Sequence, residues 1–413
     1  MNSSVSALTL FQPREVRRMA HRLLDLAQAG ALAHVRVDPA RLGEALVTVL
    51  ETTRADYPDF HIPPYGIWRD FEAGGIDRWG AMAGARNFES AGEMLAAATD
   101  LAVLGTFMKT RHPQGWTYED RMTGTRATGR QATALAVFHM FAAGSFSAEM
   151  TDPYRVDAET LIRLETAELA FGLQWDMADD AGLLEDMQRH LKRLGEALAL
   201  RPDLFADGDA IRPGALATRL AKDQDGAVSA GVLLDRLLEA LAPVWVGGAQ
   251  QGEISLGDSF VHSALTDQEA ASTVPFHLAA QEMVYGLVEP FAWAGLEVAG
   301  LEELTAPADD IHAALFVHCG VLEVLSEAGD LPFREAQDRM IELRAVGSAL
   351  TDRLADLLRR ELGVPADQLP LTCILEGGTH RAGGQILERA EGKANELGKF
   401  LNPGSVFWLP FGA

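Results

Sequence analysis

The sequence predicts a mainly α-helical globular protein with a few short strands, and three observations support this fold class. Apolar residues recur at the three- and four-residue spacing of amphipathic helices along most of the 413 residues. Hydrophobic residues make up 48% of the chain and charged residues 23%, the balance of a folded protein rather than a disordered one. Strands do not alternate with helices in the pattern that builds a parallel sheet.

In the N-terminal half, the apolar spacing predicts a helix over residues 14–29. A second helix is predicted to begin at Pro39, because proline suits the first helical position. Ser90 and Glu93 have the spacing of a capping box, and the apolar residues after them predict a long amphipathic helix. Further predicted elements are a short strand at 116–118, a buried helix over 132–143, a helix from Asp157 to Phe171 and a helix over 183–200.

Proline, aspartate and glycine concentrate between residues 201 and 231, which indicates a boundary between an N-terminal helical region, 1–205, and a C-terminal helical region, 206–413. In the second region, helices are predicted over 216–220, over 233–241, from Pro275 to just before Pro290, and over 334–362, where Gly363 ends the helix. Residues 245–273 predict a strand or two, and residues 406–409 predict a short strand.

The charge and cysteine content argue against several classes of protein. Asp and Glu number 59 against 35 Lys and Arg, so the net charge is −24, and such a surface repels phosphate backbones and acidic membranes. We therefore expect neither nucleic acid nor a membrane as a partner. Cys319 and Cys373 are the two cysteines, too few for a disulfide framework or a zinc site. With no signal pattern at the start, the sequence predicts a cytoplasmic protein.

Familiar cofactor and catalytic motifs are missing from the sequence. It contains no phosphate-binding loop, dinucleotide fingerprint, His-Glu-x-x-His zinc motif or nucleophile elbow, so no cofactor is expected. His312 and His318 are separated by about 240° around a helix and do not face one metal ion. We therefore expect no metal site.

The most distinctive stretch runs from Trp68 to Trp79 and reads WRDFEAGGIDRW. Aromatic rings stack and exclude water, and arginine grips an anion with two donors, so the stretch predicts a pocket for a polar small molecule. The candidate binding residues are Trp68, Arg69, Phe71, Glu72, Asp77 and Arg78. An equally weighted alternative is a loop that fills the core with its tryptophans while its charges pair in solvent.

Three C-terminal patches are further candidates. Asp309 and Asp310 precede an apolar segment, and Glu342 and Arg344 flank the apolar face of a predicted helix. Glu376 lies between an apolar stretch and a glycine pair, a half-buried position that suits a general acid. For each patch alone, helix capping and surface pairing are the slightly favoured alternative.

Several motifs together resemble those of the uracil-catabolism protein family, the fourth gene product of the fungal URC route, which has many bacterial relatives. The motifs are residues 68–79, Val274-Pro275-Phe276-His277, Leu315-Phe316-Val317, Gly320-Val321-Leu322 and Leu375-Glu376-Gly377-Gly378-Thr379. The C-terminal half is similar, more faintly, to the queuosine 5′-phosphate N-glycosylases. There an acid-led segment, a Glu-x-Arg helix and a late carboxylate come in the order of Asp309, Glu342 and Glu376. Those enzymes resemble DNA glycosylases in fold, which implies a helical core of that kind.

The two resemblances imply a hydrolase that cleaves the N-glycosidic bond of a small ribosyl compound, such as a ribosyl-urea phosphate or a nucleoside phosphate. They imply Asp309 as the catalytic carboxylate and Glu376 or His318 as the proton donor. Glu342 and Arg344 would hold the sugar or its phosphate. The remaining implied binding residues are Phe276, His277 and Asp310.

Two alternatives stay open. The first is a metal-independent hydrolase of a ureido or ring-opened pyrimidine intermediate, and the second is a non-catalytic nucleotide-binding protein of the same pathway. In each case the expected partner is a small ribosyl or nucleotide-like molecule. The sequence does not predict the oligomeric state.

Overall fold

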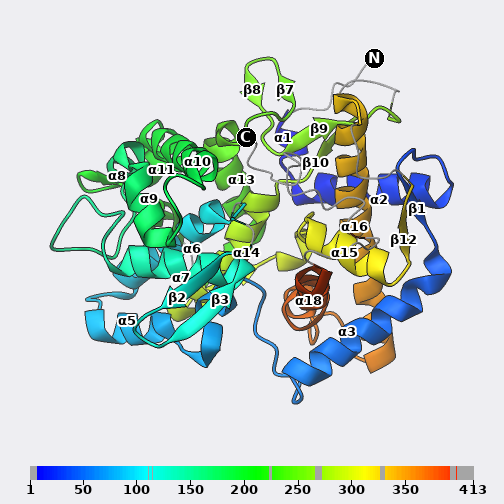
Figure 1. Ribbon diagram of the computed structural model, residues 1–413, viewed down its shortest axis with the longest axis horizontal. Helices are drawn as coiled ribbons and strands as arrows, with labels where there is room; N and C mark the ends of the chain where they lie inside the picture. Colours follow the sequence, from blue (N-terminus) through cyan, green and yellow to red (C-terminus); the bar gives the residue numbers. More distant parts are fainter. Residues whose placement is uncertain are drawn as a thin grey trace. The chain divides into compact units, whose positions relative to one another are not determined.

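The computed structural model describes residues 7–109, 111–113, 115–222, 226–265, 272–325, 331–390 and 397, and the mainly helical fold class is confirmed over them (Figure 1). The chain forms two compact units. Among the described residues, the first unit comprises 7–65, 245–281 and 300–397, and the second comprises 66–244 and 282–299. Each unit combines segments that are distant in sequence. The units therefore do not correspond to regions 1–205 and 206–413, and that division stays a prediction.

The first unit consists mainly of helices. They are α1 (Ala7–Leu10), α2 (Pro13–Gln28), η1 (Pro39–Arg41), α3 (Leu42–Asp56), η5 (Leu301–Glu303), α15 (Asp310–His318), α16 (Phe333–Leu362), α17 (Leu371–Ile374), the π-helix η6 (Leu375–Thr379) and α18 (His380–Ala390). Its strands pair antiparallel: β1 (Val35–Val37) with β12 (Leu322–Val324), β7 (Gln250–Gln251) with β8 (Ile254–Ser255), and β9 (Ser259–Val261) with β10 (Thr273–Pro275). The strands predicted within 245–273 are confirmed, whereas the strand predicted at 406–409 lies outside the described residues.

The second unit is also helical. Its helices are α4 (Trp68–Phe71), η2 (Ala73–Gly75), α5 (Arg78–Arg86), α6 (Ala91–Met108), α7 (Gly129–Ala142), α8 (Ala158–Arg163), α9 (Thr166–Leu173), α10 (Ala181–Ala199), α11 (Pro202–Phe205), α12 (Gly214–Lys222), α13 (Ala230–Leu241), η3 (Ala242–Val244) and most of α14 (Leu278–Trp293). Strands β2 (Thr117–Asp120) and β3 (Thr125–Thr128) pair antiparallel, as do β4 (Ala206–Asp207) and β5 (Ala210–Ile211), while β6 (Ala227–Ser229) and β11 (Glu297–Ala299) pair parallel.

The prediction that Pro275 starts a helix is wrong, because α14 begins at Leu278. Pro275 ends β10 instead, and His277 has a φ of 50°, a left-handed value that no α-helix accommodates. Asp258 stabilises this turn, since its carbonyl accepts from the Phe276 N–H at 2.9 Å and its carboxylate accepts from the Leu278 N–H at 3.0 Å. The start of the helix is therefore set by a residue that is distant in sequence.

The prediction that this helix stops before Pro290 is also wrong, because α14 continues to Trp293. Proline has no N–H, so the carbonyl of Gly286 loses its usual helical donor. The indole N–H of Trp68 donates to that carbonyl at 2.7 Å instead. Trp68 thereby supplies the hydrogen bond that lets the helix pass Pro290.

Helix α6 lies in the core of the second unit. Ser90 caps it by accepting from the Glu93 N–H at 3.1 Å, as predicted. The helix is not amphipathic, however, because residues 95–108 are buried on every side. Among the described helices, α6 is long and apolar enough to cross a membrane, but 78% of it is buried inside the fold, which indicates a core helix.

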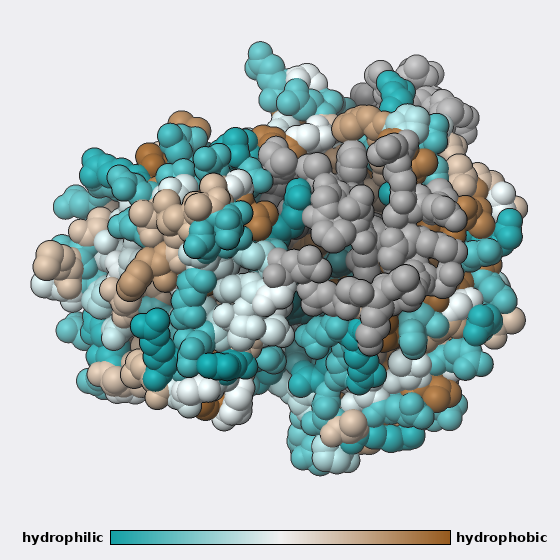
Figure 2. Space-filling view, viewed as in Figure 1, coloured by the Kyte–Doolittle hydropathy of each residue, from teal (hydrophilic) through white to brown (hydrophobic). Residues whose placement is uncertain are grey.

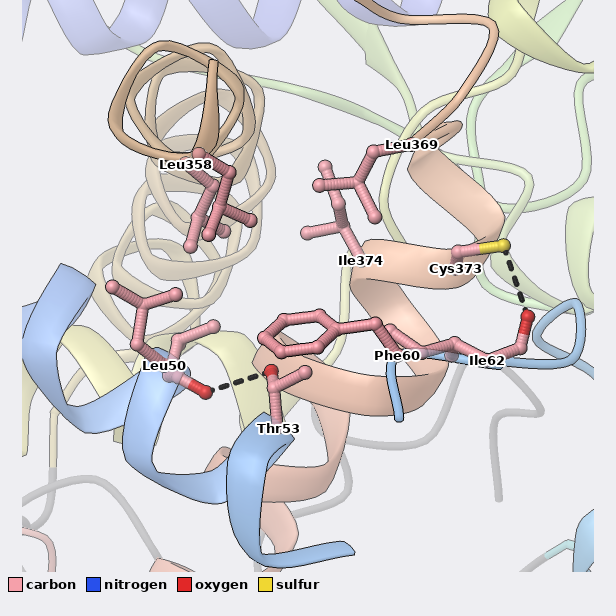
Figure 3. A pocket seen from close by; sticks show the side chains of 10 residues that line it. Leu50, Thr53, Phe60, Ile62, Leu358, Leu369, Cys373 and Ile374 are labelled. Carbon is pink, nitrogen blue, oxygen red and sulfur yellow. Dashed lines mark hydrogen bonds between the residues drawn. The ribbon is translucent and has the colours of Figure 1, made fainter. Parts of the chain in front are cut away.

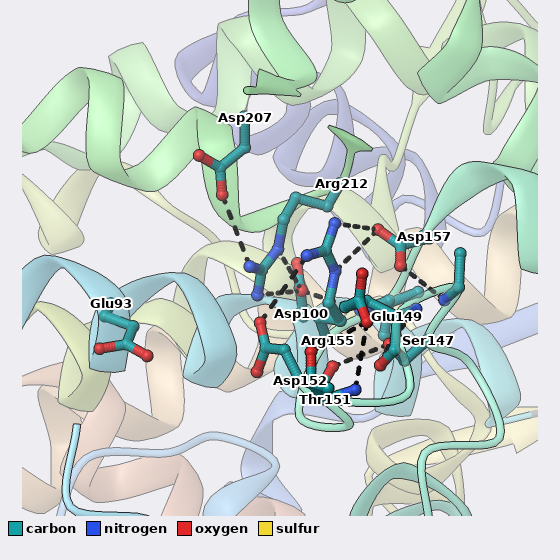
Figure 4. Close-up of polar contacts among 12 residues, drawn as sticks. Glu93, Asp100, Ser147, Glu149, Thr151, Asp152, Arg155, Asp157, Asp207 and Arg212 are labelled. Atoms are coloured by element: carbon teal, nitrogen blue, oxygen red, sulfur yellow. Dashed lines mark hydrogen bonds and ion pairs between the residues drawn. The ribbon is translucent and has the colours of Figure 1, made fainter. Parts of the chain in front are cut away.

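A polar network anchors this apolar helix (Figure 4). Asp100 is fully buried, pairs with Arg212 at 2.7 Å, and accepts from the N–H groups of Val156 and Gly214 at 2.9 and 2.6 Å. Burial raises the pKa of Asp100, an effect that the Arg212 charge and these hydrogen bonds oppose. The carboxylate therefore ties α6 to the start of α12 and to the loop before α8.

The helix predicted from Asp157 to Phe171 is two helices, α8 and α9, which the non-helical Leu164 and the extended Glu165 separate. Phe171, in α9, is 87% exposed. On the face shown in Figure 2, hydrophilic residues predominate among the described atoms and hydrophobic residues are scattered between them. That surface agrees with the net charge of −24.

Candidate active site

The aromatic residues of the stretch from Trp68 to Trp79 lie in the core of the second unit. Trp68, Phe71 and Trp79 are 2%, 1% and 7% exposed. The Trp68 ring lies 5.6 Å from that of Phe71 and 5.2 Å from that of Trp79. Trp293 stacks on Trp79 with a centroid distance of 5.6 Å and is 36% exposed. Trp293 is thus the more exposed member of this aromatic cluster.

Arg78 is a buried residue that stabilises the same stretch through hydrogen bonds. It is 5% exposed, pairs with Asp120 at 2.9 Å and donates to the carbonyls of Phe71 and Ala73 at 3.0 and 2.7 Å. Burial alone would raise the pKa of Asp120, but hydrogen bonds from Thr123 and Arg78 outweigh it and hold that pKa well below its usual range. Arg78 has no donor in reserve for a ligand, and its contacts are those of a residue that stabilises the fold.

The other charged residues of the stretch lie closer to the surface. Arg69 pairs with Glu289 at 2.7 Å and with Glu72 at 3.2 Å, and its side chain is 22% exposed. Asp77 caps α5 by accepting from the Gly80 N–H at 2.7 Å. Of the six candidates here, Arg69, Glu72 and the exposed Asp77 are therefore the ones that a ligand in solution can reach without unfolding the core.

In the first unit, Arg344 and Phe276 belong to a buried network around Asp258. Arg344 donates to both carboxylate oxygens of Asp258 at 2.7 and 2.6 Å, and its guanidinium lies 4.1 Å from the centroid of the Phe276 ring. His277 donates through Nε2 to the Leu10 carbonyl at 2.8 Å, and burial lowers its pKa. This set of contacts stabilises the turn before α14.

Arg344 also positions the segment that carries Asp309. Its Nε donates to the Ala308 carbonyl at 2.7 Å, and one turn further along α16 the Ser348 hydroxyl donates to the Ala306 carbonyl at 3.0 Å. Gly347, between them, lies so close to α15 that an added Cβ would come within 3.3 Å of the Ala313 nitrogen. Helix α16 therefore fixes the position of Asp309 at the start of α15.

Glu342, on the same helix, is 1% exposed and accepts from the backbone N–H of His34 at 2.9 Å. Its other oxygen lies 3.2 Å from Nε2 of His262. Since the Ala264 N–H donates to Nδ1 of His262 at 3.2 Å, that imidazole carries its proton on Nε2 and donates it to Glu342. Glu342 thus anchors β1 and the β9 strand end to α16.

Asp309 lies at the N-cap of α15 between two histidines. One carboxylate oxygen accepts from the backbone N–H of His312 at 3.0 Å and from its Nδ1 at 2.8 Å. The other oxygen lies 3.3 Å from Nε2 of His380. The Asp309 side chain is 11% exposed, so it is enclosed but can be reached.

The two histidines have partners of their own. Nε2 of His312 lies 3.3 Å from the Thr379 hydroxyl, and Nε2 of His380 lies 3.3 Å from the Tyr65 hydroxyl. Burial alone would raise the pKa of Asp309, but the attraction of His312 and the hydrogen bonds from His312 and His380 outweigh it. They hold the pKa of Asp309 well below its usual range, so this carboxylate stays ionised.

Glu376 lies in the π-helix η6, which leads directly into His380. It is 6% exposed and accepts from the Tyr57 hydroxyl and from Arg381, each at 3.1 Å. Glu376 is thus a buried carboxylate that pairs with a guanidinium and a phenol, and its role as a proton donor stays a prediction.

The structure separates His318 from Asp309. His318 is the last residue of α15, while Asp309 caps the start of that helix, and a helix of this length spans roughly 13 Å. His318 is also exposed. Asp310, the first residue of α15, lies beside Asp309 and is half-buried.

A small apolar pocket of about 20 Å³, large enough for little more than a water molecule, lies beside α17 in the first unit (Figure 3). Its walls come from α3, α16, α17 and the segment before Tyr65. The lining residues are Val49, Leu50, Thr53, Phe60, Ile62, Leu358, Leu362, Leu369, Cys373 and Ile374. The pocket offers few polar groups, so it does not suit a ribosyl compound.

The sequence did not single out Tyr65, Thr379 and His380 as residues near Asp309. Two of them, Thr379 and His380, come three and four residues after Glu376, in the patch that the sequence did identify. Tyr65 follows the proline pair that stiffens the approach to Trp68. The local signal was thus present, but the contact with Asp309 depends on the packing of α18 against α15.

The fold and this geometry define a mainly helical protein whose first unit holds an ionised carboxylate flanked by two histidines at a helix N-terminus. The chain belongs to the family described as "Protein of unknown function (DUF1688)", whose sequence profile matches residues 9–397.

Two curated proteins are similar over nearly their whole lengths. Protein urg3 of Schizosaccharomyces pombe is 26% identical over 401 residues, which cover 94% of this chain and 95% of that protein. Uracil catabolism protein 4 of Lachancea kluyveri is 24% identical over 436 residues, which cover 95% of this chain and 97% of that protein. These relatives confirm the resemblance to the uracil-catabolism protein family that the motifs indicated.

Proposed function

We propose that this protein is a hydrolase of pyrimidine catabolism that cleaves the N-glycosidic bond of a small ribosyl compound, of the ribosyl-urea or nucleoside phosphate type. The name of the relative from Lachancea kluyveri supports the pathway. The chemistry rests on one observation: the Asp309 carboxylate lies between His312 and His380 at a helix N-terminus, in a position that is enclosed but reachable.

Cleavage of an N-glycosidic bond needs a group of this kind. As the base leaves, positive charge builds on the ribose ring, and a fixed carboxylate stabilises that charge most where water is excluded. Because Asp309 is ionised before substrate arrives, no proton has to leave it first. His312 and the helix N-terminus hold it in one orientation.

Two charged residues of α16 contribute to the site without contacting Asp309 themselves. Arg344 positions the segment before Asp309 through Ala308, and Glu342 anchors the same helix, so both act on the site through the fold. His318 has no part in the proposed chemistry.

The test is a product assay on the full chain with four probes: uridine, uridine 5′-monophosphate, ribosylurea and ribosylurea 5′-phosphate. The proposal predicts release of ribose or ribose 5-phosphate together with uracil or urea from at least one probe. Since the described residues hold no group of three His, Cys, Asp or Glu side chains that could bind a metal ion, the rate should persist in EDTA.

The same assay separates the two alternatives. A hydrolase of ureido or ring-opened intermediates would release ammonia or carbon dioxide while the sugar stays attached to nitrogen. A non-catalytic binding protein would shift its melting temperature with a probe and release no product. Either result, in place of free sugar, would contradict the proposal.

A further inference from the structure

Nε2 of His380 lies near two groups, the Asp309 carboxylate and the Tyr65 hydroxyl, which require different protonation states of that nitrogen. Its Nε2 lies 3.3 Å from Asp309 and 3.3 Å from the Tyr65 hydroxyl, and the ring is 5% exposed. An ionised carboxylate only accepts, so Nε2 must carry a proton to bond to Asp309. The Tyr65 hydroxyl can donate to Nε2 only when that nitrogen has lost its proton. Both protonation states of Nε2 therefore find a partner.

His312 differs from His380 in this respect. Its Nδ1 donates to Asp309 at 2.8 Å, and its Nε2 accepts from the Thr379 hydroxyl at 3.3 Å. The ring is fully buried. His312 thus has one consistent arrangement of protons and serves to orient Asp309, whereas His380 has two.

Several close contacts hold His380 in place. It follows the π-helix η6, a kind of turn that is uncommon and is found often at functional sites. Gly383, on the same helix, approaches α15 so closely that an added Cβ would lie 2.3 Å from the Ile311 carbonyl oxygen. Tyr65 is anchored by its own N–H, which donates to the Thr372 carbonyl at 3.0 Å. The proximity of His380 to Asp309 is therefore built into the packing of α18 on α15.

We propose that His380 is the base that takes the proton of the attacking water, while Asp309 remains ionised beneath the sugar and Tyr65 positions the imidazole. This inference rests on the proposed function. A strongly acidic carboxyl is a weak base, so Asp309 provides the negative charge and the imidazole accepts the proton. The ordinary pKa of a histidine side chain lies near neutral pH, which suits a base.

The step balances with one water. The bond between the ribose carbon and nitrogen breaks with its electron pair on nitrogen, which takes up a proton from solvent. The water oxygen forms the new bond to the ribose carbon, and its proton passes to Nε2 of His380. The imidazolium then returns that proton to solvent, and Tyr65 again donates to the neutral ring.

The test compares His380→Gln with the wild-type enzyme, using whichever of the four probes the wild type hydrolyses. Glutamine places an amide near the position of Nε2, so it keeps a donor for Asp309 but cannot take up a proton. We expect kcat to fall by ~10²–10⁴-fold with KM little changed, and the rise of kcat with pH on the acidic side to disappear. In Tyr65→Phe, kcat should still rise with pH on the acidic side, but the rise should occur at a different pH.

A His380→Gln enzyme that keeps both the rate and the acidic limb would overturn the inference. If the variant instead unfolds, which its melting temperature and circular dichroism would reveal, Tyr65→Phe decides. An acidic limb that is unmoved in Tyr65→Phe would then overturn the inference.

A second measurement does not depend on turnover. The His380 ring is followed by NMR through a pH titration in the wild-type chain and in Asp309→Asn. The inference requires that loss of the Asp309 charge move the titration of this ring, and an identical titration would overturn it. If the ring responds but no probe is hydrolysed, the proposed function fails while the coupling of Asp309 to His380 stands.

Discussion

At the scale of the residue, Trp68 shows most clearly that the aromatic residues of the stretch from Trp68 to Trp79 stabilise the fold. Its indole N–H replaces the helical donor that Pro290 lacks, and its ring packs between Phe71 and Trp79. Arg78 holds the same stretch through backbone carbonyls. These residues thus follow the alternative in which tryptophans fill the core, while Arg69 and Glu72 stay near solvent.

Trp68→Phe should therefore destabilise the protein although the ring remains aromatic. The Gly286 carbonyl would lose its donor inside the core, at a cost of about 1–3 kcal/mol. Chemical denaturation measures this loss. Trp175→Phe is the matched control, because Trp175 is 7% exposed and its indole N–H makes no hydrogen bond among the described residues. Equal losses in the two variants would show that the hydrogen bond is not the cause.

His190 makes the stability of the second unit sensitive to acid. Burial, followed by the repulsion of Arg193, lowers the pKa of His190 from 6.5 to about 3. The unfolded chain therefore takes up this proton as the pH falls below about 6.5, and the folded protein does not until about pH 3. The folded state thus loses stability over that interval, by up to about 1.4 kcal/mol per pH unit.

His190→Phe keeps a ring to stack on Phe107, which lies 4.8 Å away, and removes the titration. Denaturation at pH 7 and pH 5 should show that the wild type loses roughly 1–2 kcal/mol more than the variant over this step. The same loss in both proteins would assign the acid sensitivity to other groups.

At the scale of the element, apolar spacing and capping signals predicted most helices. Ser90 and Gly363 act where the sequence placed them, because a cap depends on residues within one turn. The errors arose where the deciding partner is remote: Asp258 sets the start of α14, and Trp68 carries it past Pro290. The same limit applies to the site, where Asp309 was a candidate from its local pattern but His380 reaches it through helix packing.

The pair between Asp100 and Arg212 allows a test of how much a buried ion pair stabilises helix α6. Asp100→Asn keeps the shape but removes the closest counter-ion of the buried Arg212 charge and leaves only the more exposed Asp207, 3.5 Å away, which should cost ~3–5 kcal/mol in the free energy of unfolding. Glu159→Gln is the control, since its pair with Arg163 is exposed and should contribute less than about 1 kcal/mol. A loss for Asp100→Asn as small as that of the control would mean that α6 does not depend on this pair.

At the scale of the whole molecule, the family profile covers residues 9–397 and so includes parts of both units. The charged candidates near solvent, Arg69, Glu72 and Asp77, belong to the second unit, and the Asp309 cluster belongs to the first. The overall charge of −24 suits a small substrate that is met by a few local cations rather than an extended anionic polymer.

The central claim is that Asp309 supplies the negative charge for cleavage of an N-glycosidic bond, and Asp309→Asn tests it most directly. Asparagine is as good an N-cap as aspartate, so α15 should remain intact while the charge is lost. With the hydrolysed probe, turnover should fall by ~10²–10⁴-fold, whereas the probe should still raise the melting temperature. Asp38→Asn, at the exposed N-cap of η1, should keep wild-type turnover. Near-wild-type turnover in Asp309→Asn would contradict the account.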